Sequence, residues 1–497
     1  MRERLKHLTT GVAIYGAGDA AIQIVNVLLL AVYVKGGFLT SVDYGALAVL
    51  VAIEAFAKVV SRLGLDGAFM RYFHERGDDI ARLSSTIAWC LVVVNAIVFG
   101  SAWLFADAIG RRIFDQQVYV TALRLMLLNM GLMALTFIPF HVMRLKRQAA
   151  TYSAFMFARS IGTLVLRIVL VIGLGHGVAG MYAADVIMTV VLVPLMWPWF
   201  RPYLRFTFSR ADLRTVLRFG LPRVPHGLAQ QALDGGNKLL LGAYVPQAQL
   251  GVYQNAVTLG TGVKFFTSAF ETAWAPFYYA TASQPDARET FSRMTTYALA
   301  MLVLIVAGTT AVAHDAILVM LTPEYLAAAP VLPLVAIGMA CQGVYLLTSI
   351  GLNLTSRTEF YPIATITAAI VGLGGGALLM PRFGVTGAAV ALLLAYATQA
   401  SVAYVFAQRL YPIRYERARI VRVIAAGVMA ALAARMVPDM PPLAGLVVRG
   451  LTTVGVFVGL LGLSGFLRAS ERAFVCEQWQ RRRPRASVPP TEASRGR

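Results

Sequence analysis

Long apolar stretches separated by short polar loops follow one another along almost the whole chain. A helix needs about 20 apolar residues to cross the hydrocarbon core of a bilayer, and fourteen stretches of this kind can be marked. Their approximate ranges are 9–34, 43–65, 84–109, 118–140, 154–175, 179–200, 215–243, 249–275, 294–314, 328–350, 361–381, 384–408, 419–437 and 442–467. Membrane strands would be about 10 residues long and would alternate apolar with polar positions. The pattern therefore predicts an all-α integral membrane protein with about 14 transmembrane helices.

The segment 41–73 recurs as the segment 247–279, offset by 206 positions without a gap. Matched positions include Gly45 with Gly251, Lys58 with Lys264 and Tyr72 with Tyr278. A unit of six helices is thus predicted to occur twice, and an even helix number gives both copies the same orientation in the membrane. We expect an N-terminal lobe over 1–210 and a C-terminal lobe over 211–410, in a parallel pseudo-two-fold arrangement. Helices 13 and 14 would then occupy 411–467, before a basic tail over 468–497 whose composition predicts disorder.

The composition agrees with a membrane protein, because 58% of the 497 residues are hydrophobic. The formal charge of +20 could indicate nucleic-acid binding, but the distribution of charge argues against it. With the N-terminus in the cytoplasm, about 30 of the 44 Lys and Arg residues fall on the cytoplasmic side. Those expected outside are Lys35, Arg111, Arg112 and Arg382. The positive-inside rule then predicts a multi-pass protein of the plasma membrane with both termini in the cytoplasm, and no nucleic-acid partner.

Sequence patterns of enzymes and metal sites are not found. There is no HExxH, no GxSxG and no phosphate-binding loop, and the cysteines, Cys90, Cys341 and Cys476, have no metal-site spacing. We therefore expect no catalytic residue, no metal and no cofactor.

Charged residues inside the predicted spans are the candidate functional residues, because each costs at least about 2.5–3.5 kcal/mol at the bilayer centre. Lys58, Arg62 and Lys264 are the candidate substrate-binding residues, and the matched lysines could face one central cavity with an anion between them. Alternatively, Glu54 neutralises Lys58 one turn away, and Lys264 is neutralised in the same way. Arg159 and Arg167 lie eight residues apart on the predicted helix 5.

A second set of charges could act in gating or in ion coupling. Asp19 and Arg223 occupy matched positions with opposite signs and could form a salt bridge between the lobes; alternatively, each pairs within its own lobe. Glu54 and Glu271 complete this set. Asp234 and Lys238, four residues apart, are expected to pair with each other.

Several short motifs resemble those of a known family. They are DYG at 43–45, GLP at 220–222, LGVY at 250–253, AWAPFYYA at 273–280 and GVTGAAVA at 384–391. In order and spacing they resemble polysaccharide biosynthesis flippases, which handle O-antigen or exopolysaccharide units, within the multidrug/oligosaccharidyl-lipid/polysaccharide exporter superfamily.

The resemblance implies a transporter rather than an enzyme. It would flip an oligosaccharide linked to undecaprenyl pyrophosphate from the cytoplasmic to the outer leaflet of the bacterial inner membrane, by alternating access, for lipopolysaccharide or exopolysaccharide assembly. Implied partners are the lipid-linked oligosaccharide, membrane lipids, and the polysaccharide polymerase and chain-length machinery. The chain is also similar to peptidoglycan-precursor flippases, whose cavity is cationic, although helix 1 carries the acidic Asp19. The alternatives are a drug or small-cation exporter, which needs an acidic or aromatic cavity, and a membrane glycan polymerase or ligase, which needs a large outer loop.

Overall fold

The computed structural model describes Leu29 and residues 31–466, apart from 76–79, 115, 147, 356 and 358. Throughout these residues the regular structure is helical, and eight helical spans are long and apolar enough to cross a membrane. The predicted all-α membrane class is confirmed. Most of the predicted first helix, with Asp19, lies outside the described residues. The count of 14 helices and the lobe boundaries stay predictions.

The α-helices of the described chain fall into the following segments. They are α2 (Ser41–Arg62), α3 (Leu65–Glu75), α4 (Ile80–Leu104), α5 (Ala106–Ile113), α6 (Gln117–Met133), α7 (Phe137–Leu145), α8 (Ala149–Arg167), α9 (Gly177–Leu195), α10 (Trp197–Phe200), α11 (Arg210–Gly220), α12 (Arg223–Gln231), α13 (Asn237–Gly242), α14 (Gln247–Thr281), α15 (Ala287–Met320), α16 (Leu332–Thr348), α17 (Ile350–Leu354), α18 (Phe360–Leu410), α19 (Arg417–Arg435) and α20 (Pro442–Leu463). Short π-helical segments follow α8, as η3 (Ile168–Gly173), and α12, as η5 (Ala232–Gly236).

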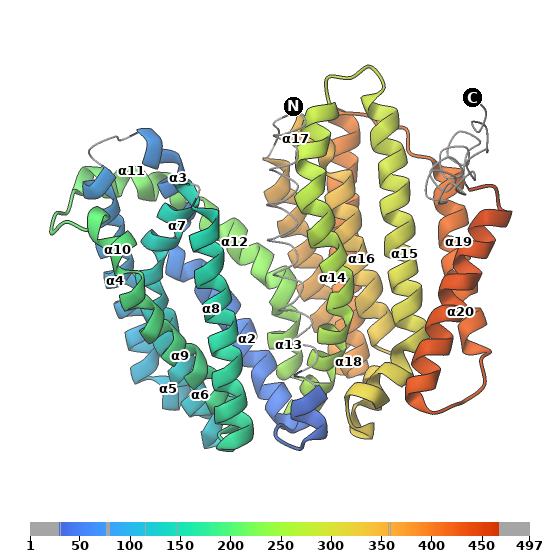
Figure 1. Cartoon of the computed structure of the whole chain (residues 1–497), viewed down its shortest axis with the longest axis horizontal. Helices are drawn as coiled ribbons and strands as arrows, with labels where there is room; N and C mark the ends of the chain where they lie inside the picture. The colour runs from blue at the N-terminus through green and yellow to red at the C-terminus, as the bar shows by residue number, and fades with distance from the viewer. Residues whose placement is uncertain are drawn as a thin grey trace, which may run out of the picture.

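Figure 1 shows two helix bundles side by side. The first holds α3 to α11, and the second holds α13 to α18, with α19 and α20 on its far edge against α15. Between them, α2 runs obliquely from the first bundle to α14, and α12 crosses from the first bundle to the second. The two bundles therefore meet along α2, α12 and α14, and residues on these helices are placed to face both.

The two repeated segments meet through their matched glycines, where α2 and α14 begin. A Cβ atom on Gly45 would lie 1.9 Å from the carbonyl oxygen of Gln247, and one on Gly251 would lie 2.0 Å from the carbonyl oxygen of Ser41. Ser41 and Gln247 are themselves matched across the repeat. The contact is thus reciprocal, as a local two-fold axis between the helices would make it. Only glycine allows the two backbones to approach this closely.

The beginning and end of α2 are fixed by local chemistry. Thr40 caps its N-terminus in a capping box, since the Asp43 carboxylate accepts from the Thr40 amide at 2.8 Å while the Thr40 hydroxyl accepts from the Asp43 amide at 3.3 Å. The helix ends at Leu63 and Gly64, both with positive φ (51° and 68°). This tight turn places Arg62 in the last turn of α2 and Asp66 in the first turn of α3.

The longest helical segment, α18, consists of two arms. Gly384 breaks it with φ 50° and ψ −125°, a conformation that favours glycine. The arms lie antiparallel, because a Cβ atom on Gly372 would be 2.8 Å from the Cβ of Ala395. They correspond to the predicted stretches 361–381 and 384–408. The predicted stretch 215–243, in contrast, is divided into α11, α12, η5 and α13, and its first break falls at Leu221–Pro222, where proline removes a backbone donor.

Candidate anion-binding site

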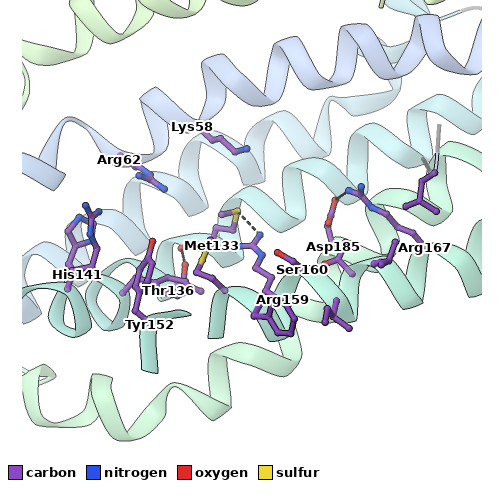
Figure 2. Close-up of a pocket in the computed structure, with 18 residues that line it drawn as sticks. Lys58, Arg62, Met133, Thr136, His141, Tyr152, Arg159, Ser160, Arg167 and Asp185 are labelled. Atoms are coloured by element: carbon purple, nitrogen blue, oxygen red, sulfur yellow. Dashed lines mark hydrogen bonds and ion pairs between the residues drawn. The ribbon is translucent and has the colours of Figure 1, made fainter. Parts of the chain in front are cut away.

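A cavity of about 760 Å³ lies beside α2, within the first bundle (Figure 2). Side chains from α2, α7, α8 and α9 line it, and the charged ones are mostly basic. Its basic lining residues are Lys58, Arg62, Arg144, Arg159 and Arg167, and its one described acidic lining residue is Asp185. Positive charge held in a partly enclosed, largely apolar space attracts anions more strongly than the same charge on an open surface.

Lys58 and Arg62 enter the cavity from α2, one turn apart on one face, as the sequence predicted. Each also has a carboxylate four residues away: Lys58 Nζ lies 2.8 Å from Glu54 Oε1 of the same helix, and Arg62 Nη1 lies 3.1 Å from Asp66 Oδ1 at the start of α3. The pairing with Glu54 that was considered as an alternative is therefore present. About half of each basic side chain (48% and 51%) is still exposed, so pairing leaves both accessible to a bound anion.

Arg159 and Arg167 enter from the opposite side, on α8. Arg167 pairs with Asp185 of α9, with Nη2 2.9 Å from Oδ2. For Arg159, the described polar contact is the thioether of Met133, 3.7 Å from Nη2. A thioether is a weak acceptor, and no carboxylate among the described residues lies within 4 Å of this guanidinium. Arg159 therefore brings to half-buried surroundings in the middle of the cavity a positive charge that no described carboxylate neutralises (Figure 2).

Arg159 is the site residue that sequence reasoning did not select. Its signal was the eight-residue spacing from Arg167 on an otherwise apolar helix, which puts both side chains on one face. That spacing did not reveal that Asp185 would neutralise Arg167 and that no described carboxylate would neutralise Arg159, because the pairing is made across two helices.

A second cavity of about 540 Å³ lies on the other side of α2, toward α12. Lys58 and Arg62 line it as well, together with Glu54, Asp66 and Arg223. The Arg223 guanidinium stacks 4.3 Å from the Phe219 ring centroid and fits tightly against Gly67 of α3. Arg223 thus joins the same charged region from the start of α12. Its predicted partner, Asp19, lies outside the described residues, so that salt bridge stays a prediction.

Lys264, the repeat partner of Lys58, lies in different surroundings. Its Nζ is 3.4 Å from Asp234 Oδ1 and 3.4 Å from the Tyr396 hydroxyl, and the Tyr396 hydroxyl donates to Asp234. Gln230 Nε2 donates to the other Asp234 oxygen at 3.0 Å. The expected pair of Asp234 with Lys238 is wrong, because these three groups take the carboxylate instead.

Lys264 is consequently not brought together with Lys58 and Arg62. It lines neither of the two cavities beside α2. Glu271 is exposed on the same helix, α14, two turns further on. The roles predicted for Lys264 and Glu271 stay predictions.

The arrangement suits binding of an anion with several charges, rather than chemistry on a substrate. Basic side chains converge from two sides of one space, and arginine can donate two parallel hydrogen bonds to a phosphate group. Within the described part of the chain, no cluster of His, Cys, Asp and Glu could hold a metal ion.

Comparison with known proteins identifies a family. The profile of a family described as polysaccharide biosynthesis protein matches residues 37–330. Among curated proteins, no relative matches the sequence.

Solved structures share the fold at low sequence identity. A lipid II flippase, MurJ, in an inward closed conformation is similar with a TM-score of 0.76 and 10% identity, over 90% of this chain and 98% of that one. An inward-facing multidrug resistance MATE transporter of the MOP superfamily gives 0.61 and 16%, over 82% and 98%. A MOP superfamily transporter from Pyrococcus furiosus, described as having a binding pocket of reverse polarity, gives 0.54 and 16%, over 84% and 96%.

Proposed function

Because the chain belongs to the family of polysaccharide biosynthesis proteins and has the fold of MOP superfamily transporters, not of enzymes, we propose that it flips a lipid-linked oligosaccharide across the membrane. The substrate is an oligosaccharide on undecaprenyl pyrophosphate, and it moves from the cytoplasmic to the outer leaflet of the bacterial inner membrane. The product serves assembly of a surface polysaccharide, such as lipopolysaccharide or exopolysaccharide.

The observation that carries this proposal is the positive charge of the side chains that line the cavity beside α2. Five basic side chains line it against one described carboxylate, and Arg159 has no acidic partner among the residues that the structure describes. A diphosphate diester carries two negative charges at neutral pH, and Lys58, Arg62 and Arg159 approach the same space from α2 and α8 (Figure 2). A cationic drug would be repelled there, so the charge argues against the alternative of a drug exporter.

The proposed architecture is the two-lobe arrangement predicted from the repeat, with fourteen helices and both termini in the cytoplasm. In this orientation α2 and α14 begin at the outer side, where Gly45 and Gly251 hold the bundles together. Arg62 lies at the cytoplasmic end of α2. With this orientation, we propose a state that is closed at the outer side and loads its substrate from the cytoplasm, while the prenyl chain remains in lipid.

The membrane potential favours the proposed direction. With the cytoplasm negative, each negative charge moved outward gains about 2.3 kcal/mol per 100 mV. Lys264 is kept as a proposed substrate contact from the second bundle, weaker than Lys58 because Asp234 and Tyr396 already hold its ammonium group. Arg223, Asp19, Glu54 and Glu271 are kept as proposed gating or coupling residues.

Complementation of a bacterial strain that lacks its own polysaccharide flippase tests the proposal. The double variant Lys58→Gln/Arg159→Gln loses two charged contacts, so surface polysaccharide should fall at least about tenfold, the effect of 1.4 kcal/mol. Lipid-linked oligosaccharide should accumulate in the inner leaflet. The matched control is Arg382→Gln, which removes an exposed basic residue of α18 that lines neither cavity.

Membrane abundance of each variant is measured in parallel by immunoblotting. Normal export by the double variant at wild-type abundance would contradict a role for the cavity in substrate binding. Failure of the wild-type protein to complement strains with any lipid-linked oligosaccharide would contradict the proposed function itself.

A further inference from the structure

The segment between α10 and α11 carries two phenylalanines on its surface. It follows η4 (Arg201–Tyr203) and lies on the edge of the first bundle that is turned away from the second (Figure 1). Phe206 is 91% exposed and Phe208 is 53% exposed. Large apolar side chains that stand exposed close together mark a surface that meets lipid or another protein.

Hydrogen bonds to α4 hold the backbone of this segment in place. The Arg205 amide donates to the buried hydroxyl of Ser85. The Ser209 amide donates to the buried hydroxyl of Thr86 at 3.1 Å. Tyr203, which precedes the two phenylalanines, is buried in the core of the first bundle. The chain is thus fixed on both sides of the phenylalanines, so their exposure is a property of the fold and not of a loose loop.

One of the two phenylalanines extends the apolar surface of α4. The ring centroids of Phe206 and Trp89 lie 6.2 Å apart. Trp89 begins a row of exposed apolar side chains that continues on one face of α4 through Val93, Ile97 and Leu104. Because α4 is long and apolar enough to cross a membrane, this row faces hydrocarbon. In the orientation proposed above α4 begins in the cytoplasm, so Phe206 lies at the cytoplasmic edge of the lipid-facing surface, where tryptophan is also common.

Basic side chains surround the phenylalanines. Five arginines lie between residues 201 and 218, all of them exposed: Arg201, Arg205, Arg210, Arg214 and Arg218. The one acidic residue of this stretch is Asp212, which is buried and pairs with Arg82 of α4 at 3.0 Å. The surface beside the phenylalanines therefore carries an excess of positive charge.

From these observations we propose that this segment binds an anionic phospholipid of the cytoplasmic leaflet. Phe206 and Phe208 insert among the acyl chains. Arg201, Arg205 and Arg210 contact the phosphates of the headgroups. Aromatic rings next to basic side chains suit this depth, because the bilayer there changes from hydrocarbon to charged headgroups. The bound lipid fixes the depth of the first bundle in the membrane. The inference uses the proposed orientation but not the proposed substrate, so it does not depend on flipping.

The position of Phe206 favours lipid over a protein partner. Its ring packs against Trp89, which lies inside a membrane span and belongs to a row of apolar side chains along that helix. A soluble protein could cover Phe208 and the arginines, but it would have to displace lipid to reach the side of Phe206 that faces the tryptophan.

Photolabelling of the full chain in phosphatidylcholine nanodiscs tests the site. Photoreactive phosphatidylglycerol and photoreactive phosphatidylcholine, with the reactive group at the same acyl position, are compared at equal mole fraction. Mass spectrometry measures the labelling of peptides that contain residues 206–209. A basic residue near an anionic surface contributes about fivefold to binding, so labelling by the phosphatidylglycerol probe should be at least about fivefold higher.

The arginines are tested by the double variant Arg201→Gln/Arg205→Gln. It should bring labelling by the two probes to within about twofold of each other, because two of the headgroup contacts are lost. The matched control is Arg111→Gln/Arg112→Gln, which removes two exposed arginines of α5 at the opposite end of the first bundle. This control should keep the wild-type preference at residues 206–209.

The phenylalanines are tested by the double variant Phe206→Ser/Phe208→Ser. It should lower labelling of this segment by both probes, because the segment no longer enters the acyl chains. Equal labelling of the wild-type protein by the two probes would overturn the preference for an anionic lipid. Absence of labelling by either probe would overturn the lipid contact and leave this surface to a protein partner.

A measurement on the wild-type protein serves if the arginine variant does not reach the membrane. Raising the salt concentration to 1 M shortens the Debye length to about 3 Å, so the preference for phosphatidylglycerol should fall strongly. A preference that is unchanged at 1 M salt would overturn the role of the arginines.

Discussion

Lys58 and Lys264 occupy matched positions in the two repeats, yet their surroundings differ in kind. Lys58 pairs with Glu54 one turn away on its own helix and faces a cavity. Lys264 is held by Asp234 and Tyr396, which come from two other elements, η5 and α18. The first arrangement leaves a cation free to exchange partners, whereas the second ties three elements of one bundle together. Duplication has thus preserved a position and a charge, but the neighbours decide whether that charge can serve a ligand.

The two repeats do remain alike at the contact between Gly45 and Gly251. Substitutions at these glycines should have the largest effect on stability. Gly45→Leu and Gly251→Leu would each force a side chain into a backbone carbonyl, at 1.9 and 2.0 Å from the required Cβ position. Overpacking of this kind costs about 1–3 kcal/mol, and more where backbone has to move. We expect both variants to lower the midpoint of thermal unfolding in detergent, and by similar amounts because the contact is reciprocal.

A glycine in the same helix supplies the control. Gly262 of α14 has open space where a Cβ would be, so Gly262→Leu should be neutral or slightly stabilising. Unequal effects of the two test substitutions would show that the local two-fold relation does not extend to the energetics.

The charged networks of the two repeats give the second expected effect. Asp234→Asn removes the charge that Lys264, Tyr396 and Gln230 all contact, and loss of such hydrogen bonds to a charged group costs about 2 kcal/mol. Glu54→Gln breaks a pair between residues four apart on one helix, which costs only about 0.5 kcal/mol. Unfolding measurements should therefore separate the two variants clearly, and equal destabilisation would show that the Lys58 pair is structural as well.

The difference between contacts within one helix and contacts between distant segments explains what the sequence could and could not predict. Glu54, Lys58, Arg62 and Asp66 recur every four residues, so their common face and their pairing follow from helical geometry alone. The partners of Lys264 are 30 and 132 residues away, and no local spacing reveals them. Arg159 was not selected for a related reason, since its importance comes from the lack of a carboxylate partner among the described residues.

Interruptions of the helices were also predicted from the sequence only in part. The sequence predicted separate stretches on the two sides of Gly384, where the structure has a break. It predicted one stretch over 215–243, which the structure divides at Leu221–Pro222, where proline removes a backbone donor. The π-helical segments η3 and η5 carry no comparable signal, although η5 places Asp234 toward Lys264. Local chemistry thus predicted where helices begin and end better than it predicted which charges meet.

The smallest expected effect concerns ligand affinity, and it bears directly on the comparison of the two lysines. Lys58→Gln should weaken binding of a prenyl diphosphosugar about fivefold, since a charge-assisted contact of partly exposed groups contributes about 1 kcal/mol. Lys264→Gln should change the affinity less than about twofold, because Asp234 and Tyr396 already occupy its ammonium group. Isothermal titration calorimetry with the same prenyl diphosphosugar measures both affinities. If the two variants instead weaken binding equally, the lysines act as the matched clamp that the repeat predicts. The bundles would then have to close further around the ligand, with Lys264 released from Asp234, and the asymmetry described above would belong to the unliganded state only.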